Sequence, residues 1–501
     1  MLNRLMNNRY LATSIALVCG LLVPLSFAPH NLPFIELLSL SGMLLLVRSF
    51  GQRFAIFLWF VFGLGMFGYG VWWIQVSVHQ FGLPLYSFSV TVTAAFIIAQ
   101  ACQIAIFGWF ANNMLNTEST LGTLIGIPAS WVAIEIFRSW FGSGFPWLLL
   151  GYAHVESPLA GFAPIGGVHL VSFCIVFIAS SLYLVLHRQQ SMYLLPAALV
   201  ITVAYGLDKI SWTKNITPVE RSVALVQGAV PQEIKWHPEV RQPSIDLYNS
   251  LSEPYWDRDL IIWPETAIPA FSDEVATAID ELSKRAIASD TVFLVGMPNR
   301  SGPNDDGTRT SYFNSLLLLG RASGRYDKRH LVPFGEFMPF DSILRPLTDM
   351  LNVPMSDFSK GKSNNAILKS GDIAIGSSIC YEDAYSGLLR DALPDANVLV
   401  NISNDAWFGD TIAPHQHLQI SQMRALELGR YMLRATNTGI SAIINERGRV
   451  VSRSEQFEAQ AIVGSFYLFQ GYTPYARVGS LPILLFSTLG VIALKIRARR
   501  G

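Results

Sequence analysis

Cys380 is the residue with the clearest chemical potential in this chain of 501 residues. It ends an alternating apolar run, residues 372–380, and is followed at once by Tyr381, Glu382 and Asp383. The other three cysteines lie inside long apolar stretches: Cys19, Cys102 and Cys174. A lone thiol at the end of a strand, beside carboxylates, is typical of a nucleophile rather than of a structural crosslink.

Two further reactive side chains follow strand-like runs. Glu265 comes after the apolar run 261–263, which Pro264 stops. Lys328 lies in the polar segment 326–336, shortly after another strand-like run. Active-site groups gather at the carboxyl ends of strands in α/β sheets. Each residue alone also fits a plainer interpretation: a surface carboxylate, a solvated lysine or, for Cys380, an inert core cysteine.

Taken together, the three side chains predict covalent acyl chemistry. A thiol attacks well only as thiolate, which requires a neighbouring base or cation. Glu265 could accept the thiol proton, while Lys328 and the main-chain N–H of Tyr381 could stabilise the oxyanion formed at an attacked acyl carbon. Glu336 could be a second acid or could orient Lys328, and His330 is either a base or a structural hydrogen-bond partner.

Other site chemistries lack a sequence signal. The histidines His415 and His417 are two positions apart, in a segment that we expect to be a loop beginning at Pro414. Cysteine pairs with metal-ligand spacing are absent from the sequence, as is a glycine-rich phosphate loop. The sequence therefore predicts neither a metal nor a cofactor.

Apolar stretches dominate the first part of the chain. The sequence is 51% hydrophobic and 14% charged, with a net charge of zero, which gives no reason to expect a nucleic-acid partner. A membrane span needs about 20 predominantly apolar residues. We expect eight spans, two of them short, at about 11–28, 33–49, 54–75, 86–110, 121–140, 166–187, 191–207 and 477–494.

The basic residues predict an orientation, because cytoplasmic loops are enriched in Lys and Arg. With the N-terminus inside, one side of the membrane carries Arg4, Arg9, Arg48, Arg53, Arg188, Lys495, Arg497, Arg499 and Arg500. The opposite loops carry only Arg138 before the polar region begins. We therefore expect seven spans over 1–207, an outer domain over 208–475, and an eighth span with a basic cytoplasmic tail over 476–501. The first span resembles a signal peptide, but Pro29 argues that it is retained.

The outer region predicts an α/β domain. Strand-like runs cover 222–227, 260–263, 292–297, 312–319, 373–379, 398–402, 439–444 and 461–466. Helical patterns fall at about 272–288, 384–393 and 415–434. In the last of these, Arg424, Glu427, Arg430 and Arg434 form a polar stripe whose spacing allows salt bridges.

These motifs resemble the nitrilase superfamily, whose Glu–Lys–Cys triad occurs in the same sequence order. The resemblance rests on four segments: Trp263-Pro264-Glu265, Lys328 to Glu336, Cys380-Tyr381-Glu382 and Asn401 to Gly409. It implies a four-layer α-β-β-α sandwich.

Apolar spans on both sides of such a domain resemble, more narrowly, the apolipoprotein N-acyltransferase family of the bacterial inner membrane. The segments 226–228, 231–236 and 414–427 fit that pattern as well. The expected fold is thus a membrane helical bundle of eight transmembrane helices plus a nitrilase-like domain in the periplasm.

The resemblance implies a two-step acyl transfer. Cys380 would take an acyl chain from a phospholipid, typically phosphatidylethanolamine, as a thioester, with Glu265 as general base and Lys328 as oxyanion stabiliser. The amine of a diacylglyceryl-cysteine at an apolipoprotein's N-terminus would then accept the chain. Supporting positions are Glu336, Tyr381, Glu382 and Trp236. We expect a monomer, since the reaction needs no second subunit.

Two alternatives have other consequences. The triad alone is compatible with a membrane-tethered amidohydrolase that uses water as acceptor. An enzyme that hydrolyses soluble amides would, however, not need eight membrane spans. A transporter or scaffold would show eroded catalytic positions. Residues 340–358 form an amphipathic pattern that either packs on the domain or acts as a mobile arm admitting lipid.

Overall fold

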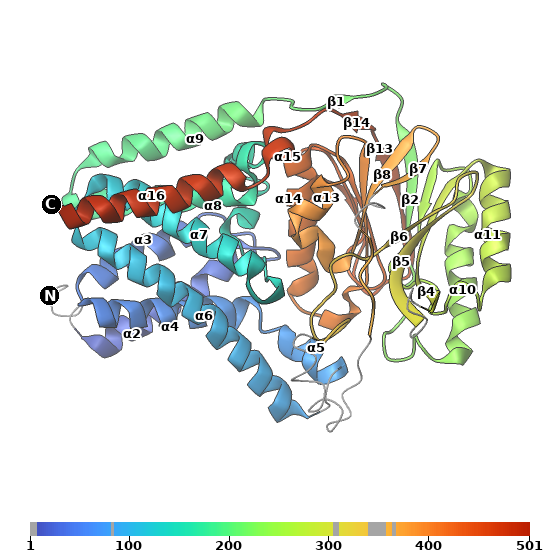
Figure 1. Cartoon of the computed structure of the whole chain (residues 1–501), viewed down its shortest axis with the longest axis horizontal. Helices are drawn as coiled ribbons and strands as arrows, with labels where there is room; N and C mark the ends of the chain where they lie inside the picture. The colour runs from blue at the N-terminus through green and yellow to red at the C-terminus, as the bar shows by residue number, and fades with distance from the viewer. Residues whose placement is uncertain (1–7, 82–84, 304–309, 339–356, 363–366, 501) are drawn as a thin grey trace. The chain divides into compact units, whose positions relative to one another are not determined.

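The chain forms two compact units (Figure 1). The computed structural model describes residues 8–81, 85–303, 310–338, 357–362 and 367–500. The first unit comprises Met1–His79, Pro84–Ser211 and Arg477–Gly501, and the second comprises Gln80–Leu83 and Trp212–Ala476. The expected amphipathic arm at 340–358 lies, apart from its last two residues, outside the described residues.

The first unit is helical. Its helices are α2 (Arg9–Leu22), α3 (Ile35–Arg48), α4 (Gln52–Gly70), α5 (Ile74–Phe81), α6 (Tyr86–Asn116), α7 (Ile127–Trp140), α8 (Ala163–Arg188), α9 (Leu194–Asp208) and α16 (Leu481–Arg500). Within the described residues, six helical stretches are long and apolar enough to cross a membrane: Arg9–Ser26, Gln52–Gly70, Tyr86–Asn116, Gly122–Ser143, Pro158–Arg188 and Ser191–Asp208.

The expected count of eight spans is therefore not confirmed, although six of the eight correspond to such helices. Helix α3 has 14 residues, which at 1.5 Å per residue is about 21 Å, less than the roughly 30 Å of a hydrocarbon core. Among the residues that the structure describes with side chains, the apolar part of α16 is Leu481–Gly490.

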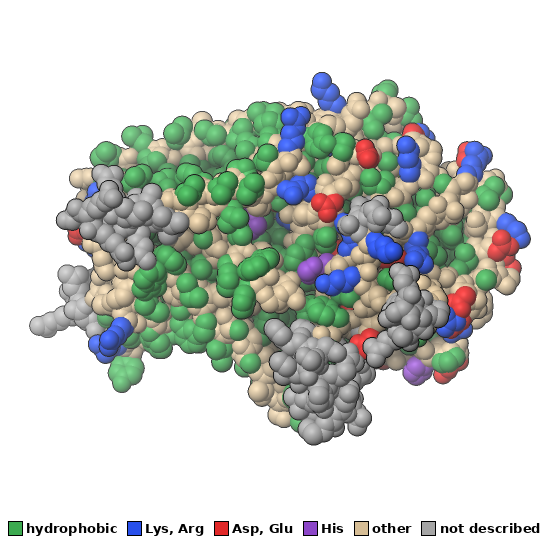
Figure 2. Space-filling view, in the orientation of Figure 1, with side chains coloured by type: hydrophobic (Ala, Val, Ile, Leu, Met, Phe, Trp, Pro, Cys, Tyr) green, Lys and Arg blue, Asp and Glu red, His purple; other side chains and the backbone are tan. Residues whose placement is uncertain are grey.

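Two glycines bring α2 and α4 into close contact. A Cβ atom built on Gly20 would lie 2.1 Å from the carbonyl oxygen of Phe62, and one built on Gly65 would lie 2.5 Å from that of Leu17. Small residues allow such approach between helices in membranes. On the face seen in Figure 2, hydrophobic side chains cover the helices of this unit, as lipid contact requires.

The second unit contains two six-stranded sheets. The first has the order β13 (Gln460–Phe466), β2 (Arg221–Gln227), β3 (Leu260–Ile262), β4 (Val292–Pro303), β5 (Thr310–Leu319) and β6 (Gly324–Asp327). The second has the order β12 (Val450–Arg453), β11 (Ala442–Ile444), β10 (Met432–Thr436), β9 (Val398–Ser403), β8 (Ile373–Ile379) and β7 (Ile367–Ser370). The central strands β2–β3–β4 and β8–β9–β10 run parallel. A short ladder joins β1 (Lys214–Asn215) to β14 (Phe469–Gln470).

The two sheets pack face to face and helices cover their outer faces (Figure 1). Apolar residues of both sheets, such as Leu294 and Val400, share one buried core. The outer face of the first sheet packs on α10 (Pro238–Ser252) and α11 (Ala276–Ser289), and that of the second on α14 (Ala413–Leu428). Two short helices, α13 (Ser386–Arg390) and α15 (Pro474–Val478), complete the unit. The expected α-β-β-α sandwich is confirmed.

One predicted helix, 415–434, is wrong in its last six residues. Helix α14 ends at Leu428, where Gly429 adopts a left-handed conformation with φ 61°. Residues Met432–Thr436 form the buried strand β10 instead. Arg424 and Glu427 do pair on the helix, at 3.0 Å, but Arg434 belongs to the sheet and cannot share their stripe.

Candidate active site

The three residues expected to react lie at strand ends of the second unit. Glu265 follows β3 and Lys328 follows β6, both in the first sheet. Cys380 follows β8 in the second sheet. The side chain of Lys328 is 1% exposed and that of Glu265 is 8% exposed, so neither is the solvated surface residue that its sequence context alone would suggest.

Lys328 joins two carboxylates, those of the buried Glu265 and the partly exposed Glu336. Its Nζ atom lies 2.8 Å from Oε1 of Glu336 and 3.6 Å from Oε1 of Glu265. Asn314 on β5 links the same pair, because its Nδ2 donates to Oε1 of Glu265 at 2.6 Å and to Oε1 of Glu336 at 3.0 Å. The structure thus brings Glu265, Lys328 and Glu336 together in one cluster.

The protonation of this cluster follows from its burial. Burial acts to lower the pKa of Lys328, but the charges of Glu336 and Glu265 raise it well above its usual range, so the amine stays an ammonium. Burial raises the pKa of Glu265; Lys328 opposes that shift and Glu336 adds to it. A carboxylate whose pKa is raised toward neutrality is suited to accept and return a proton.

Cys380 occupies a strained backbone position, with φ 54°, a left-handed value uncommon for a residue other than glycine. Burial raises the pKa of its thiol, the charge of Glu265 adds to this rise, and Lys328 opposes it. The thiol is therefore protonated at rest and needs a base during the reaction, and both Glu265 and Lys328 are close enough to act on it electrostatically.

Glu382 connects the turn Cys380–Ala384, which is called the nucleophile turn below, to the segment that follows Lys328. Its buried carboxylate accepts main-chain hydrogen bonds from Ile379 at 2.8 Å, from Arg329 at 2.6 Å and from His330 at 2.9 Å. The hydroxyl of Tyr326 donates to it at 2.8 Å. This supporting position therefore fixes Cys380 relative to Lys328.

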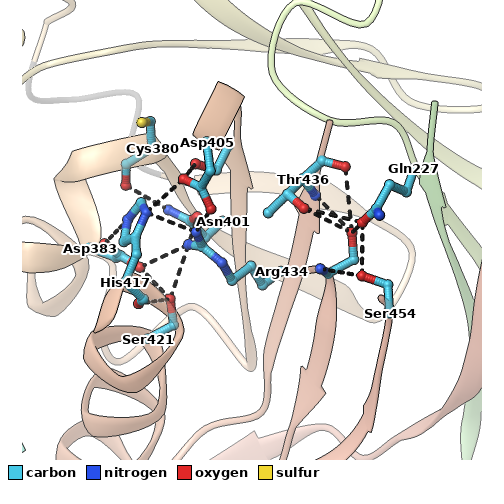
Figure 3. A network of polar contacts seen from close by, with 12 residues as sticks. Gln227, Cys380, Asp383, Asn401, Asp405, His417, Ser421, Arg434, Thr436 and Ser454 are labelled. Atoms are coloured by element: carbon cyan, nitrogen blue, oxygen red, sulfur yellow. Dashed lines mark hydrogen bonds and ion pairs between the residues drawn. The ribbon is translucent and has the colours of Figure 1, made fainter. Parts of the chain in front are cut away.

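A second buried network lies beneath Cys380 (Figure 3). The carbonyl oxygen of Cys380 accepts a hydrogen bond from Nδ2 of Asn401 at 3.1 Å, and Nη1 of Arg434 donates to Oδ1 of Asn401 at 2.7 Å. Arg434 also pairs with Asp383 at 3.3 Å and with Asp405 at 2.9 Å. The nucleophile turn thus rests on a buried ionic cluster contributed by several elements.

Two protein families match the chain, one in each unit. Residues 222–468 match the carbon-nitrogen hydrolase family, and residues 19–181 match the apolipoprotein N-acyltransferase N-terminal domain. An apolipoprotein N-acyltransferase of Vibrio cholerae is 38% identical over 100% of both chains. The chain belongs to the apolipoprotein N-acyltransferase family.

A second full-length relative agrees with this family membership. An apolipoprotein N-acyltransferase of Methylococcus capsulatus is 38% identical over 98% of this chain and 96% of its own. Among solved structures, the nitrilase-superfamily protein Nit3 of Saccharomyces cerevisiae matches 52% of this chain and 94% of its own at 16% identity, with a TM-score of 0.36. The family resemblance expected from the sequence motifs is confirmed by the full-length relatives.

His417 pairs with two buried aspartates in this member of the apolipoprotein N-acyltransferase family. It lies on α14, not in a loop as expected, with Nε2 3.0 Å from Asp383 and Nδ1 2.9 Å from Asp405. Burial and the charge of Arg434 act to lower the pKa of His417, but the two aspartates raise it to about 9. The imidazole is therefore a buried cation at neutral pH.

This predicts a loss of stability at alkaline pH. A histidine with a pKa of about 9 when folded and 6.5 as its ordinary value stabilises the fold fully below pH 6.5. That contribution, on the order of 3 kcal/mol, is lost as the pH rises through 9. We expect the melting temperature of the wild type to fall between pH 6.5 and 10, and that of His417→Gln to change less over this range. Parallel pH dependences in the two proteins would contradict the assignment.

A second polar cluster in Figure 3 joins the two sheets. The side-chain oxygen of Gln227, at the end of β2, accepts hydrogen bonds from Ser441 at 2.7 Å and from Ser454 at 2.8 Å. Thr436, at the end of β10, donates to the same oxygen at 3.3 Å. Hydrogen bonds therefore tie the layer that carries Glu265 to the layer that carries Cys380.

The sequence did not indicate every residue around the site. Asn314 lies within a strand-like run that gave no reason to single it out. Arg434 was assigned to a helix. Lys235 was noted only as part of a matching segment, next to the expected supporting residue Trp236. The structure places Lys235 against Glu265, whereas the side chain of Trp236 is 50% exposed.

Proposed function

We propose that the chain transfers an acyl group from a phospholipid to the N-terminal amine of a diacylglyceryl-apolipoprotein, through a thioester on Cys380. The chain is an acyltransferase of lipoprotein maturation, as its full-length relatives indicate. The observation that carries the covalent mechanism is the buried thiol within electrostatic reach of Glu265 and Lys328.

The first step forms the thioester. Glu265 takes the proton of the Cys380 thiol as sulfur attacks the ester carbonyl carbon of the phospholipid. The Lys328 ammonium stabilises the negative charge that develops on the carbonyl oxygen. The carbon–oxygen bond then breaks, and Glu265 returns the proton to the departing lysophospholipid hydroxyl. Glu336 holds Lys328 at 2.8 Å throughout.

The second step transfers the chain. The free amine of the diacylglyceryl-cysteine attacks the thioester carbon and gives its proton to Glu265, while the carbon–sulfur bond breaks. Glu265 then passes this proton to the departing Cys380 sulfur, which restores both the thiol and the carboxylate. A thioester reacts readily with amines, so both lipid substrates can use one site in turn. Tyr381, Glu382 and Trp236 act as supporting positions around Cys380.

The membrane arrangement and the partners follow from this function. We infer eight transmembrane helices, with α3 and α16 added to the six long apolar helices, and a catalytic unit on the periplasmic side of the bacterial inner membrane. The distribution of Lys and Arg supports this orientation. The inferred donor is phosphatidylethanolamine and the inferred state is a monomer. A cysteine introduced at the exposed Lys284 in a Cys380→Ala background should react with a membrane-impermeant maleimide from the periplasmic side only.

A hydrolase that uses water as acceptor is the alternative. The carbon-nitrogen hydrolase match covers only residues 222–468. The match to the N-terminal domain of the acyltransferases and the full-length relatives favour transfer to an amine.

Intact mass spectrometry tests the mechanism. The purified protein incubated with phosphatidylethanolamine should gain the mass of one acyl chain, and Cys380→Ala should gain none. Addition of a diacylglyceryl-cysteinyl peptide should return the protein to its original mass and add the chain to the peptide. Release of free fatty acid without peptide acylation would favour the hydrolase. Absence of an adduct in a preparation that still acylates the peptide would overturn the covalent mechanism.

A further inference from the structure

Lys235 is a buried lysine to which the mechanism above gives no role. It lies in the turn after β2 and is 1% exposed. Its main-chain N–H donates to the carbonyl oxygen of Pro231 at 3.1 Å. The start of the same segment is fixed by Asn437, whose carbonyl oxygen and side chain accept hydrogen bonds from Ala229 at 2.9 Å and Val230 at 3.1 Å. The lysine is thus built into the interior of the domain.

The amine of Lys235 is directed at the residue that is to act as base. Its Nζ atom donates to the main-chain carbonyl oxygen of Glu265 at 3.3 Å. The carboxylate of Glu265 meets Asn314, Lys328 and Glu336. Glu265 is therefore held between two amines, Lys328 at its side chain and Lys235 at its backbone.

The charges of this buried cluster balance only when Lys235 is counted. Glu265 and Glu336 carry two negative charges when ionised, and Lys328 carries one positive charge. A net negative charge in a buried site is unfavourable, and the cluster would relieve it by taking up a proton on Glu265. A protonated Glu265 cannot accept the proton of Cys380. A second ammonium beside Glu265 removes the imbalance.

We propose that Lys235 is a positioning residue of the acyl transfer, whose positive charge keeps Glu265 ionised and so able to take the proton from Cys380. The inference rests on the proposed function, in which Glu265 is the base. It assigns a role to the electrostatics of the lysine rather than to its hydrogen bond.

The titration of Lys235 agrees with this role. Burial lowers the pKa of Lys235 to about 7, and the charge of Glu265 acts in the opposite direction. The charge of Lys235 in turn lowers the pKa of Glu265, although burial of Glu265 has the larger, raising effect. Lys235 therefore carries its charge mainly below about pH 7, which is the acidic side of the rate profile, where Glu265 would otherwise take up a proton.

Three substitutions separate charge from hydrogen bonding. Lys235→Met removes both the charge and the donor, Lys235→Gln keeps an N–H donor without charge, and Lys235→Arg keeps both. The measured quantity is the rate of Cys380 acylation by phosphatidylethanolamine between pH 5 and 9, followed by intact mass in the full-length protein. Lys284→Met, which removes an exposed lysine on α11, is the matched control.

We expect Lys235→Gln and Lys235→Met to move the acidic limb of the rate profile upward by about one pH unit, because an opposite charge nearby shifts a carboxyl pKa by about 1–3 units. At a pH on that limb, acylation should therefore be about tenfold slower than in the wild type. Lys235→Arg and Lys284→Met should keep the wild-type limb. If Lys235→Met does not fold, the comparison of Lys235→Gln with Lys235→Arg still tests whether the charge is required.

A wild-type profile for Lys235→Gln would overturn the electrostatic role. That result is distinct from failure of the proposed function, which would appear as the absence of an acyl adduct in the wild type itself.

Discussion

Glu265→Gln should reduce the rate of Cys380 acylation about 10³-fold, within the range of about 10²–10⁴ that positioned acid–base catalysis supplies. The glutamine keeps the shape of the side chain and an oxygen for Asn314, which donates to Oε1 of Glu265 at 2.6 Å, but it cannot accept the thiol proton. Lys328 retains Glu336 at 2.8 Å, so we expect the fold to persist. The measurement is the initial rate of adduct formation by intact mass.

Glu253→Gln is the control for this substitution. Glu253 is an exposed carboxylate that pairs with Arg285 at 2.7 Å, and its removal should leave the rate unchanged. A Glu265→Gln protein that melts like the wild type and forms the adduct at a comparable rate would show that another group is the base.

Arg434→Met should lower the free energy of unfolding by about 3–5 kcal/mol, the typical effect of leaving buried charges without their partner. Arg434 is fully buried and pairs with Asp383 and Asp405. Methionine fills much of the volume, but among the described residues it leaves His417 as the one cation paired with the two aspartates. The loss should lower the melting temperature by about 10 °C, measured by the thermal unfolding of the purified protein.

Arg300→Met tests whether the loss of stability expected for Arg434→Met depends on burial of the arginine. Arg300 lies on the surface and pairs with Asp273, and an exposed pair contributes little to stability. The melting temperature should therefore stay close to that of the wild type. Equal effects of the two substitutions would contradict the role of the buried network.

Most of the core strands could be predicted from the sequence, because strands that are buried on both faces consist of continuous apolar runs. Strands such as β8 and β9 are buried along their whole length. The prediction failed where a segment with helix-like spacing of charged residues forms a buried strand. The helical spacing of Arg424, Glu427, Arg430 and Arg434 suggested one helix over 415–434. Residues Met432–Thr436 form the strand β10 instead, and every residue of β10 is buried. Arg434 can lie in a central strand only because residues distant in the chain supply its counter-charges.

The predicted site residues divide in the same way. Glu265, Lys328, Cys380 and Glu336 could be proposed because reactive side chains follow strand ends and match a known motif. Asn314 could not, because an amide in the middle of a strand has no distinguishing neighbour in the sequence. The role now proposed for Lys235 likewise depends on a contact across 30 residues, which no local pattern encodes.

The division of the reacting groups between the two sheets has a consequence for how the enzyme can be perturbed. Glu265 and Lys328 come from one layer and Cys380 from the other, so the distance between the proposed nucleophile and the proposed base is set by the alignment of one layer against the other. Side chains such as Leu294 and Val400, which fill the space between the layers, act as spacers for the reaction. Because attack geometry tolerates little displacement, a changed volume there should alter turnover even where the protein remains folded. In this enzyme the hydrophobic core between the sheets therefore helps to set the spacing of the proposed catalytic groups.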